Sequence, residues 1–175
     1  MKRLLLIVSS LLFLSVGCVP PMNLVDFKNY DDVTGLFIYE DVVQLENTGN
    51  SPDELFDKLH HWVVLNYVSS NDVIQLKDEK NHTLIVKGNF KTNLFGKDGY
   101  FPHILELYTK DGRYKYKITV KSYYSFGSGE MSFNSKSMGF KNKIFTDVET
   151  RVQRTLLSIK NHVSSSESKK KQDDW

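Results

Sequence analysis

Apolar and polar side chains alternate with a period of two along the middle of the chain, between residues 74 and 120. This pattern predicts four antiparallel strands, each with one buried face and one exposed face. A further strand of uncertain register is predicted over Leu36–Leu45. In the first hairpin of the four, a loop of odd length around Glu79–Asn81 brings Leu76 opposite Leu84, because this register keeps both apolar faces on one side.

The second hairpin has a clearer turn signal. Asp111–Gly112 is the chemistry that two-residue type I′ turns prefer. Counting outward from this turn pairs Leu107 with Tyr116 on one face and Glu106 with Lys117 on the other. The first face is therefore predicted to be core, and the second to meet solvent.

Two stretches carry apolar residues at helical spacing. The first follows Ser51–Glu54, where serine is the N-cap, proline takes the first helical position and glutamate reaches back to the cap amide. This helix is expected to end near Ser69–Asn71. The second follows an equivalent capping box at Thr146–Glu149. The apolar positions of the two predicted helices are Leu55, Leu59, Trp62 and Val63, and Val148, Val152, Leu156, Ile159 and Val163.

These elements predict one α+β domain over residues 36–163, with the order β-α-β-β-β-β-α. Residues 122–143 lose the periodicity and are rich in Gly, Ser, Asn and aromatic residues. They are predicted to be an irregular insertion, either functional or poorly ordered. Residues 18–35 are predicted to form a polar tether, and residues 164–175 a disordered polar tail.

The first 17 residues have the layout of an export signal. Lys2 and Arg3 precede an apolar run over Leu4–Leu14, which is too short to span a bilayer. Cys18, the single cysteine of the chain, follows small residues at the expected cleavage point, as in a bacterial lipobox. We therefore expect Cys18 to be acylated and to anchor the protein in a membrane. Ser15 departs from the commonest lipobox, and the alternative is ordinary secretion with a free thiol.

Removal of this signal changes the charge balance. The whole chain has 23 Lys and Arg against 21 Asp and Glu, and Lys2 and Arg3 account for the excess. The mature chain is formally neutral, which gives no support to general attraction to nucleic acid or to acidic membranes. Because no second cysteine is present, the fold cannot rely on a disulfide.

Several motifs in residues 51–120 resemble a known family. They are the capped helix carrying Trp62, the strand containing VIQ, the strand end at Lys87–Phe90, and the hairpin DGRYKY. Together they resemble a family of bacterial envelope domains of unknown function that have a TATA-binding-protein-like fold. The resemblance implies a curved antiparallel sheet with two helices packed on one face, and secreted or lipid-anchored members. It implies no activity and no catalytic residues.

Catalytic motifs are absent from the sequence. The five histidines include no pair at the i,i+4 spacing of helical metal ligands, and no phosphate-binding glycine loop or nucleophile elbow occurs. We therefore expect a protein that is not an enzyme and has no cofactor or metal. A hydrolase whose catalytic residues are scattered along the chain is the less favoured alternative.

The alternation also predicts a candidate binding face on the side of the sheet opposite the helices. Its members are Lys77, Lys87, Lys115, Lys117, Lys121 and Tyr108. One hypothesis is that this weakly basic face binds an anionic envelope component or a partner strand. The alternative is that these are ordinary solubilising lysines on a half-exposed sheet.

The sequence thus predicts an envelope lipoprotein that acts as a non-catalytic binding module. A structural or assembly subunit is the alternative. The expected partners are the membrane, through acylated Cys18, and an envelope protein or anionic glycan, but not nucleic acid. The expected location is the outer membrane, facing the periplasm. A concave pocket with convergent polar groups would favour capture of a small ligand, and a flat apolar patch would favour a protein partner.

Overall fold

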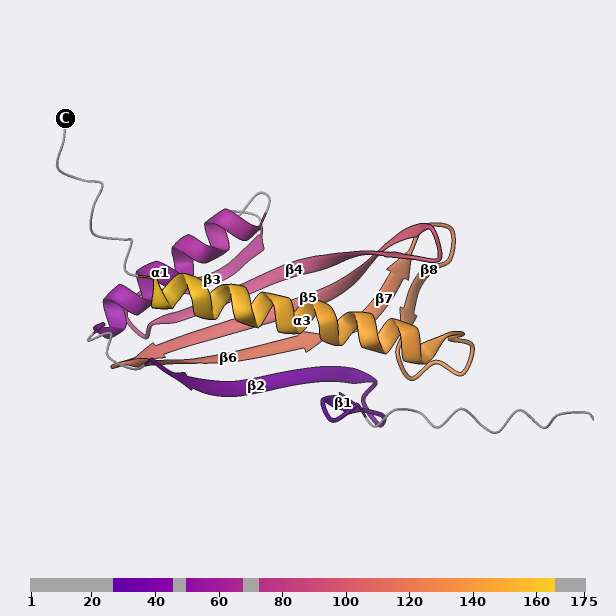
Figure 1. The fold of residues 1–175 in the computed structure, drawn as a ribbon, viewed down its shortest axis with the longest axis horizontal. Coiled ribbons are helices and arrows are strands. Elements are labelled where there is room, and N and C mark those ends of the chain that lie inside the picture. The colour runs from indigo at the N-terminus through magenta and orange to yellow at the C-terminus, as the bar shows by residue number, and fades with distance from the viewer. Residues whose placement is uncertain (1–26, 46–49, 68–72, 166–175) are drawn as a thin grey trace, which may run out of the picture.

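The computed structural model describes residues 27–45, 50–67 and 73–165. Eight strands and two helices occur in these ranges (Figure 1). In chain order they are β1 (Tyr30–Asp31), β2 (Leu36–Gln44), α1 (Pro52–Asn66), β3 (Ile74–Asp78), β4 (Thr83–Leu94), β5 (Lys97–Lys110), β6 (Arg113–Val120), β7 (Ser122–Ser125), β8 (Gly129–Ser132) and α3 (Lys141–Ser164).

The strands form one curved antiparallel sheet in the order β1-β2-β6-β5-β4-β3. Beyond the end of β6, β7 takes its place beside β5 and pairs in turn with β8. Both helices lie on one face of this sheet, and α3 runs along its length (Figure 1). The predicted α+β fold, with a curved antiparallel sheet covered by two helices on one face, is confirmed.

The core lies between the sheet and the helices and contains a cluster of aromatic rings. Phe37 of β2 meets the rings of Phe133 and Phe145 edge to face, with centroids 5.1 and 4.8 Å apart. Phe133 and Phe145 meet each other in the same way, at 5.6 Å. Edge-to-face pairs of this kind add to the stability that burial of the rings provides. The cluster fixes the start of α3 against β2.

The N-terminus of α1 follows the sequence prediction. Ser51 Oγ accepts a hydrogen bond from the Glu54 amide at 3.2 Å, and Glu54 Oε2 accepts one from the Ser51 amide at 3.1 Å. The helix ends at Asn66, earlier than expected, and the predicted end near residues 69–71 lies outside the described residues.

The second helix begins earlier than its predicted capping box. α3 starts at Lys141, so Thr146 lies inside the helix rather than at its cap. Phe140 is the N-cap and has left-handed backbone geometry, with φ of 55° and no side-chain cap. The buried residues Ile144 and Phe145 extend the apolar stripe of the helix towards the N-terminus. Their burial outweighs the local capping signal, because tertiary packing supplies most helix stability in proteins.

The segment 122–143, predicted to be irregular, contains regular structure. It forms β7, β8 and the first residues of α3, and its hairpin is closed with Gly127 and Gly129 at positive φ. Phe133 is fully buried, and the ring of Tyr123 packs on Phe101 with centroids 5.5 Å apart. Two of the aromatic residues that break the periodicity, Tyr123 and Phe133, are therefore core contacts.

The predicted register between β3 and β4 is wrong. A four-residue connection leaves Lys77, not Leu76, opposite Leu84, and Leu76 faces Ile85. A bulge between Ile74 and Leu76 then returns Ile74 to a position opposite Val86 on the core face. Leu76 is consequently half exposed.

The hairpin of β5 and β6 has the predicted register but a different turn. Leu107 lies opposite Tyr116, and Lys110 opposite Arg113. A type I′ turn needs positive φ at both central residues, whereas here only Gly112 has it. The combination of two positive φ angles occurs instead at Phe95–Gly96, which connects β4 to β5.

The tether predicted over residues 18–35 is too long. The ring of Phe27 packs edge to face on Phe145 with centroids 5.3 Å apart, and Phe27 is 8% exposed. Tyr30 and Asp31 form β1, which pairs with β2. Residues 27–35 therefore belong to the domain, and residues 1–26, including the predicted signal and Cys18, lie outside the described residues, as do residues 166–175. Across the described ranges, neither helix combines the length and the apolar character needed to cross a membrane.

Candidate functional site

Most of the predicted lysine face has the expected orientation. Lys87 alternates with buried residues of β4, Lys115 and Lys117 with those of β6, and Tyr108 with those of β5; these four residues lie on the sheet face opposite the helices. Lys121 is exposed just after β6.

Lys77 is on the other side of the sheet, which corrects its predicted place on the lysine face. It pairs with the buried Leu84, and its charge contributes to lowering the pKa of His60 on α1. The bulge in β3 is the physical reason, because one extra residue reverses the faces of the residues beyond it.

Carboxylates accompany the lysines at the centre of this face. Lys115 Nζ lies 2.5 Å from Glu40 Oε1, and this hydrogen bond lowers the pKa of Glu40. Lys117 lies in register between Glu40 of β2 and Glu106 of β5. The Tyr108 hydroxyl donates to Glu106 Oε2 at 2.7 Å. The sequence could not place Glu40 here, because the register of β2 was undetermined. The face is therefore a mixed lattice of charges rather than a basic platform.

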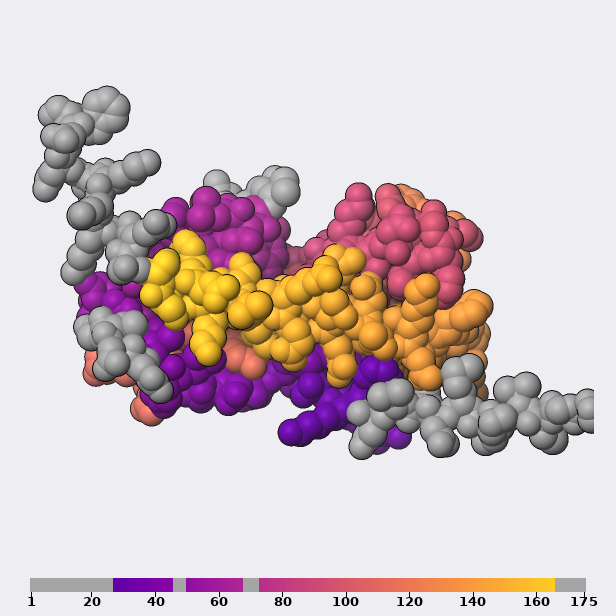
Figure 2. All heavy atoms as spheres, in the orientation of Figure 1, coloured from indigo at the N-terminus to yellow at the C-terminus, as the bar shows by residue number. Residues whose placement is uncertain are grey.

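The described surface is hollowed instead beside α3. A pocket of about 510 Å³ lies between α1 and α3, and we call it the helix groove. A second, more enclosed pocket of about 480 Å³ continues from it to β4, and we call it the strand pocket. Figure 2 shows a hollow in the surface between α1 and the C-terminal half of β4. The pockets share Trp62, Asn66, Arg154 and Ser158; the helix groove adds Leu157, Asn161 and His162, and the strand pocket adds Tyr67, Val73, Lys87, Gly88, Asn89, Phe90, His103 and Thr155.

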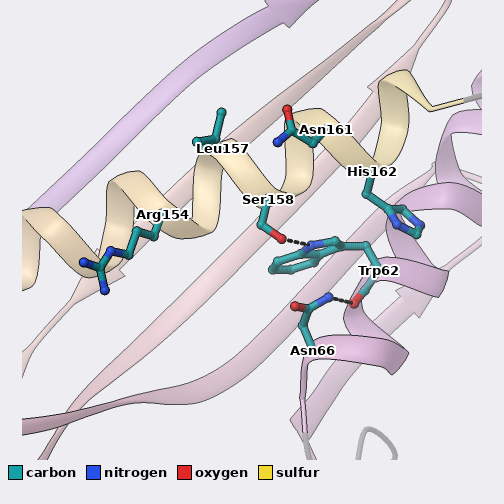
Figure 3. Close-up of a pocket in the computed structure, with 7 residues that line it drawn as sticks. All are labelled: Trp62, Asn66, Arg154, Leu157, Ser158, Asn161 and His162. Atoms are coloured by element: carbon teal, nitrogen blue, oxygen red, sulfur yellow. Dashed lines mark hydrogen bonds between the residues drawn. The ribbon is translucent and has the colours of Figure 1, made fainter.

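Trp62 connects the two helices at the boundary between the pockets. Its indole N–H donates to Ser158 Oγ at 3.0 Å, and the Asn66 amide donates to the Trp62 carbonyl at 2.9 Å (Figure 3). Trp62 is only 3% exposed, so it holds α1 against α3 and contributes an edge rather than an open ring to the groove.

A buried tyrosine and histidine form the inner wall of the strand pocket. Tyr67 Oη lies 2.8 Å from His103 Nε2, while His103 Nδ1 lies 3.4 Å from the Phe101 carbonyl. A carbonyl only accepts, so Nδ1 carries the proton and Nε2 accepts from Tyr67. Burial lowers the pKa of His103 to about 4 and raises the pKa of Tyr67. The ring of Phe90 stacks on His103 with centroids 3.7 Å apart.

Gly88 makes room for this contact. It lies directly opposite His103 in the ladder between β4 and β5. A Cβ at this position would lie 2.3 Å from Cε1 of Tyr67, which is far inside van der Waals contact. A larger residue in place of Gly88 would therefore push Tyr67 away from His103.

The polar groups that remain available in the two pockets are cationic or neutral. Within the described ranges, the side chain of Arg154, which lines both pockets, makes no hydrogen bond or ion pair. Lys87 and Asn89 also line the strand pocket, but they alternate with the inward residues of β4, so their side chains belong to the opposite face of the sheet. The described lining contains no Asp or Glu. His162 adds no charge at neutral pH, since burial lowers its pKa below its usual value. A free guanidinium without a carboxylate favours an anionic ligand, which it would bind through charge-assisted hydrogen bonds.

The arrangement offers little for acid–base chemistry. His103 is 2% exposed, and its low pKa keeps it neutral near pH 7. Among the described residues, no three His, Cys, Asp or Glu side chains gather closely enough to hold a metal ion.

The sequence prediction missed the two pockets. The alternation of apolar residues at Leu105 and Leu107 does place His103 on the buried face of β5, so its burial could have been predicted from the sequence. No sequence signal identified Arg154, because it lies outside the apolar stripe of a helix, where an exposed arginine is ordinary.

Comparison with known proteins agrees with this fold. No curated protein matches the sequence. A crystal structure of a TBP-like protein from Parabacteroides distasonis is similar, with a TM-score of 0.62, 13% identity and coverage of 75% of this chain and 94% of the other. A DUF4468 family protein from Bacteroides ovatus is similar with a TM-score of 0.58, 11% identity and coverage of 81% and 94%. At these identities the likeness concerns the fold alone.

The sequence profile described as "Domain of unknown function (DUF4468) with TBP-like fold" matches residues 39–124. This range runs from within β2 through most of β7 and so includes α1, the four strands β3 to β6, Lys87 and His103. This match assigns residues 39–124 to the DUF4468 family, and the two similar crystal structures share the TBP-like fold.

Proposed function

We propose that this protein is an envelope lipoprotein, anchored through Cys18, whose domain captures a small anionic ligand in the strand pocket and helix groove. The observation that carries the proposal is the unpartnered guanidinium of Arg154 at a pocket of about 480 Å³ without a carboxylate in its described lining. This volume lies within the range typical of small-molecule sites. The ligand class follows from charge: a carboxylated or phosphorylated compound of metabolite or short glycan size.

The binding role is proposed as non-catalytic. His103 and Tyr67 are hydrogen-bonded to each other within the inner wall of the strand pocket, and this hydrogen bond makes the wall rigid. The proposed location is the outer membrane, facing the periplasm, and the support is the export signal that precedes Cys18.

The test is a binding screen with matched ligands. Monosaccharides and short peptides are offered in carboxylated or phosphorylated form and in the corresponding neutral form, and binding is followed by protein-observed NMR. Only the anionic forms should bind, with shifts at residues of the two pockets. Arg154→Gln should weaken binding about tenfold to a hundredfold, as expected for the loss of charge-assisted hydrogen bonds.

The matched control is Lys115→Gln on the sheet face. It also removes one charge, but from a lysine that pairs with Glu40, so it should leave affinity unchanged. The proposal is wrong if neutral forms bind equally well, or if the control variant loses as much affinity as the pocket variant.

A further inference from the structure

Exposed aromatic side chains gather at one end of the molecule. The rings of Phe95 and Phe140, which are 52% and 73% exposed, lie 4.6 Å apart. Phe126, 57% exposed, packs against Tyr100 and Tyr124 with centroids 6.1 and 5.8 Å away. We call these five residues the aromatic tip. The Phe126 amide donates to the Asp98 carbonyl at 3.3 Å, so the turn after β7 lies beside the turn between β4 and β5.

The backbone at the tip is unfavourable for the residues it carries. Phe95 and Phe140 both have φ of 55°, a left-handed conformation in which a bulky side chain is strained and Gly or Asn is preferred. Both rings are largely exposed, so burial in the core does not account for phenylalanine at these positions. Exposed apolar groups held in strained turns are typical of interaction surfaces rather than of structural ones.

The tip is basic although the mature chain is neutral. Residues 91–100 and 121–143 contain six lysines and two acidic residues. Glu130 is engaged with Ser122 Oγ at 2.5 Å, and Asp98 lies 3.8 Å from Lys91. Lys143 Nζ lies 4.3 Å above the ring of Phe95. Aromatic rings bordered by lysines match the interface of an anionic bilayer, where rings enter the headgroup region and lysines meet phosphates.

The chain enters the domain at this same end. Phe27 packs on Phe145, which lies five residues along α3 from Phe140 and thus about 8 Å along the helix axis. Cys18 precedes Phe27 by nine residues, which span at most about 30 Å when extended. An acyl chain on Cys18 therefore reaches any bilayer that the tip can touch.

We propose that the aromatic tip docks on the anionic lipid surface of the membrane that holds the anchor. Phe95, Phe126 and Phe140 enter the headgroup region, and the neighbouring lysines pair with lipid phosphates. In this orientation Arg154 lies about 20 Å along α3 from the docked end, so the strand pocket opens to the aqueous compartment. The orientation rests on the proposed anchor at Cys18, whereas affinity of the tip for lipid does not depend on it.

The test uses the full mature chain with Cys18→Ala, so that no acyl chain contributes. Its partition is measured by sedimentation with vesicles of phosphatidylethanolamine and phosphatidylglycerol, and with vesicles of phosphatidylcholine alone. Binding should be weak, specific for the anionic vesicles, and reduced by salt. Phe95→Asn, Phe126→Ser and Phe140→Asn together should lower the partition coefficient at least tenfold. Asn suits the left-handed positions, so this variant keeps the fold.

The matched control replaces three exposed apolar residues elsewhere, Val42, Val64 and Leu65, with Ser. This variant should partition like the parent. Hydrogen exchange of the parent should also slow in residues 91–100 and 122–143 when anionic vesicles are added, but not in α1. Equal partition of the tip variant and the parent overturns the proposal, as does equal loss in the control variant or capture of an envelope protein by the tip without vesicle binding. None of these outcomes bears on ligand binding in the strand pocket or on acylation.

Discussion

His103 is a residue that the fold holds uncharged. Its ring is enclosed between Phe90 and Tyr67, and in the part of the chain that the structure describes its nitrogens contact a hydroxyl and a carbonyl and no charged group. Burial therefore penalises the protonated ring, and the pKa falls from 6.5 to about 4. The unfolded chain takes up a proton at a pH where the folded chain does not.

Stability should therefore fall on mild acidification. Above about pH 6.5 both states are neutral at His103, and between pH 6.5 and 4 only the unfolded state is protonated. The free energy of unfolding should decrease by about 2 kcal/mol between pH 7 and pH 5 through this residue. Urea melts of the parent and of His103→Gln measure this, since the variant should lose most of the slope whatever its stability at pH 7.

The control for this prediction is His162→Gln. The pKa of His162 is also lowered by burial, but this residue is much less enclosed than His103. Its variant should keep nearly the whole slope of the parent. Equal slopes in the parent and His103→Gln would show that His103 is not the group that titrates.

Sequence patterns identify which residues are buried more reliably than what they do. Alternation from Leu105 and Leu107 places His103 in the core, yet nothing in the sequence shows that Tyr67 is its partner, because the two are 36 positions apart. Lys77 was assigned to the wrong face for a different reason. The prediction assumed that the strand has no bulge. The bulge in β3 does not depend on a particular residue type, so the sequence gives no sign of it.

Two nearly identical capping signals in this chain have different outcomes at the level of the element. Ser51–Glu54 caps α1 with both reciprocal hydrogen bonds. Thr146–Glu149 has the same spacing but lies within α3, where Ile144 and Phe145 are buried before it. A capping box is a local preference, and a helix continues through it when the preceding turn has apolar side chains to bury.

This contrast predicts unequal effects of two similar substitutions. Ser51→Ala removes an acceptor from an orphan amide of α1 and should destabilise the domain by about 1 kcal/mol. Thr146→Ala replaces an exposed residue inside a helix by a better helix former, so its effect should be neutral or stabilising, by up to roughly 0.5 kcal/mol. Denaturant melts at pH 7 compare them directly. Similar losses in both variants would mean that Thr146 acts as a cap.

The strands could be predicted where apolar and polar residues alternate regularly. The prediction failed in the segment where aromatic residues interrupt this alternation. Residues 122–143 combine outward Tyr124 and Phe126 with inward Tyr123 and Phe133, so hydrophobicity alone gives no period. Their ordering depends on β5 continuing past β6 to offer an edge, which is a property of the whole sheet.

Across the whole molecule, charge is unevenly distributed. Lysines and exposed rings gather at the tip, the sheet face alternates lysine with carboxylate, and the pockets carry the unpartnered guanidinium of Arg154. The near balance of 23 Lys and Arg against 21 Asp and Glu in the sequence hides this separation. A net charge near zero argues against general attraction to an acidic membrane. That argument describes the average surface, and it does not apply to the aromatic tip.

The proposed anchoring through Cys18 predicts a clear result at this scale. Cys18→Ala should remove acylation, and the protein should leave the membrane fraction after a wash at high salt, which also releases the tip. The unmodified protein should stay in the membrane fraction through the same wash. Retention of the variant after washing would contradict anchoring through Cys18, and mass spectrometry of both proteins shows whether the acyl group is present.

The packing of Phe27 against the start of α3 also separates the two ends of the described domain. Phe27 lies beside Phe145, and the chain leaves α3 at Ser165, twenty residues and about 30 Å further along the helix. A peptide joining these ends in a circularly permuted protein would need at least about nine extended residues. An affinity tag or reporter domain fused after the helix would accordingly start about 30 Å from Phe145, beside which Phe27 packs.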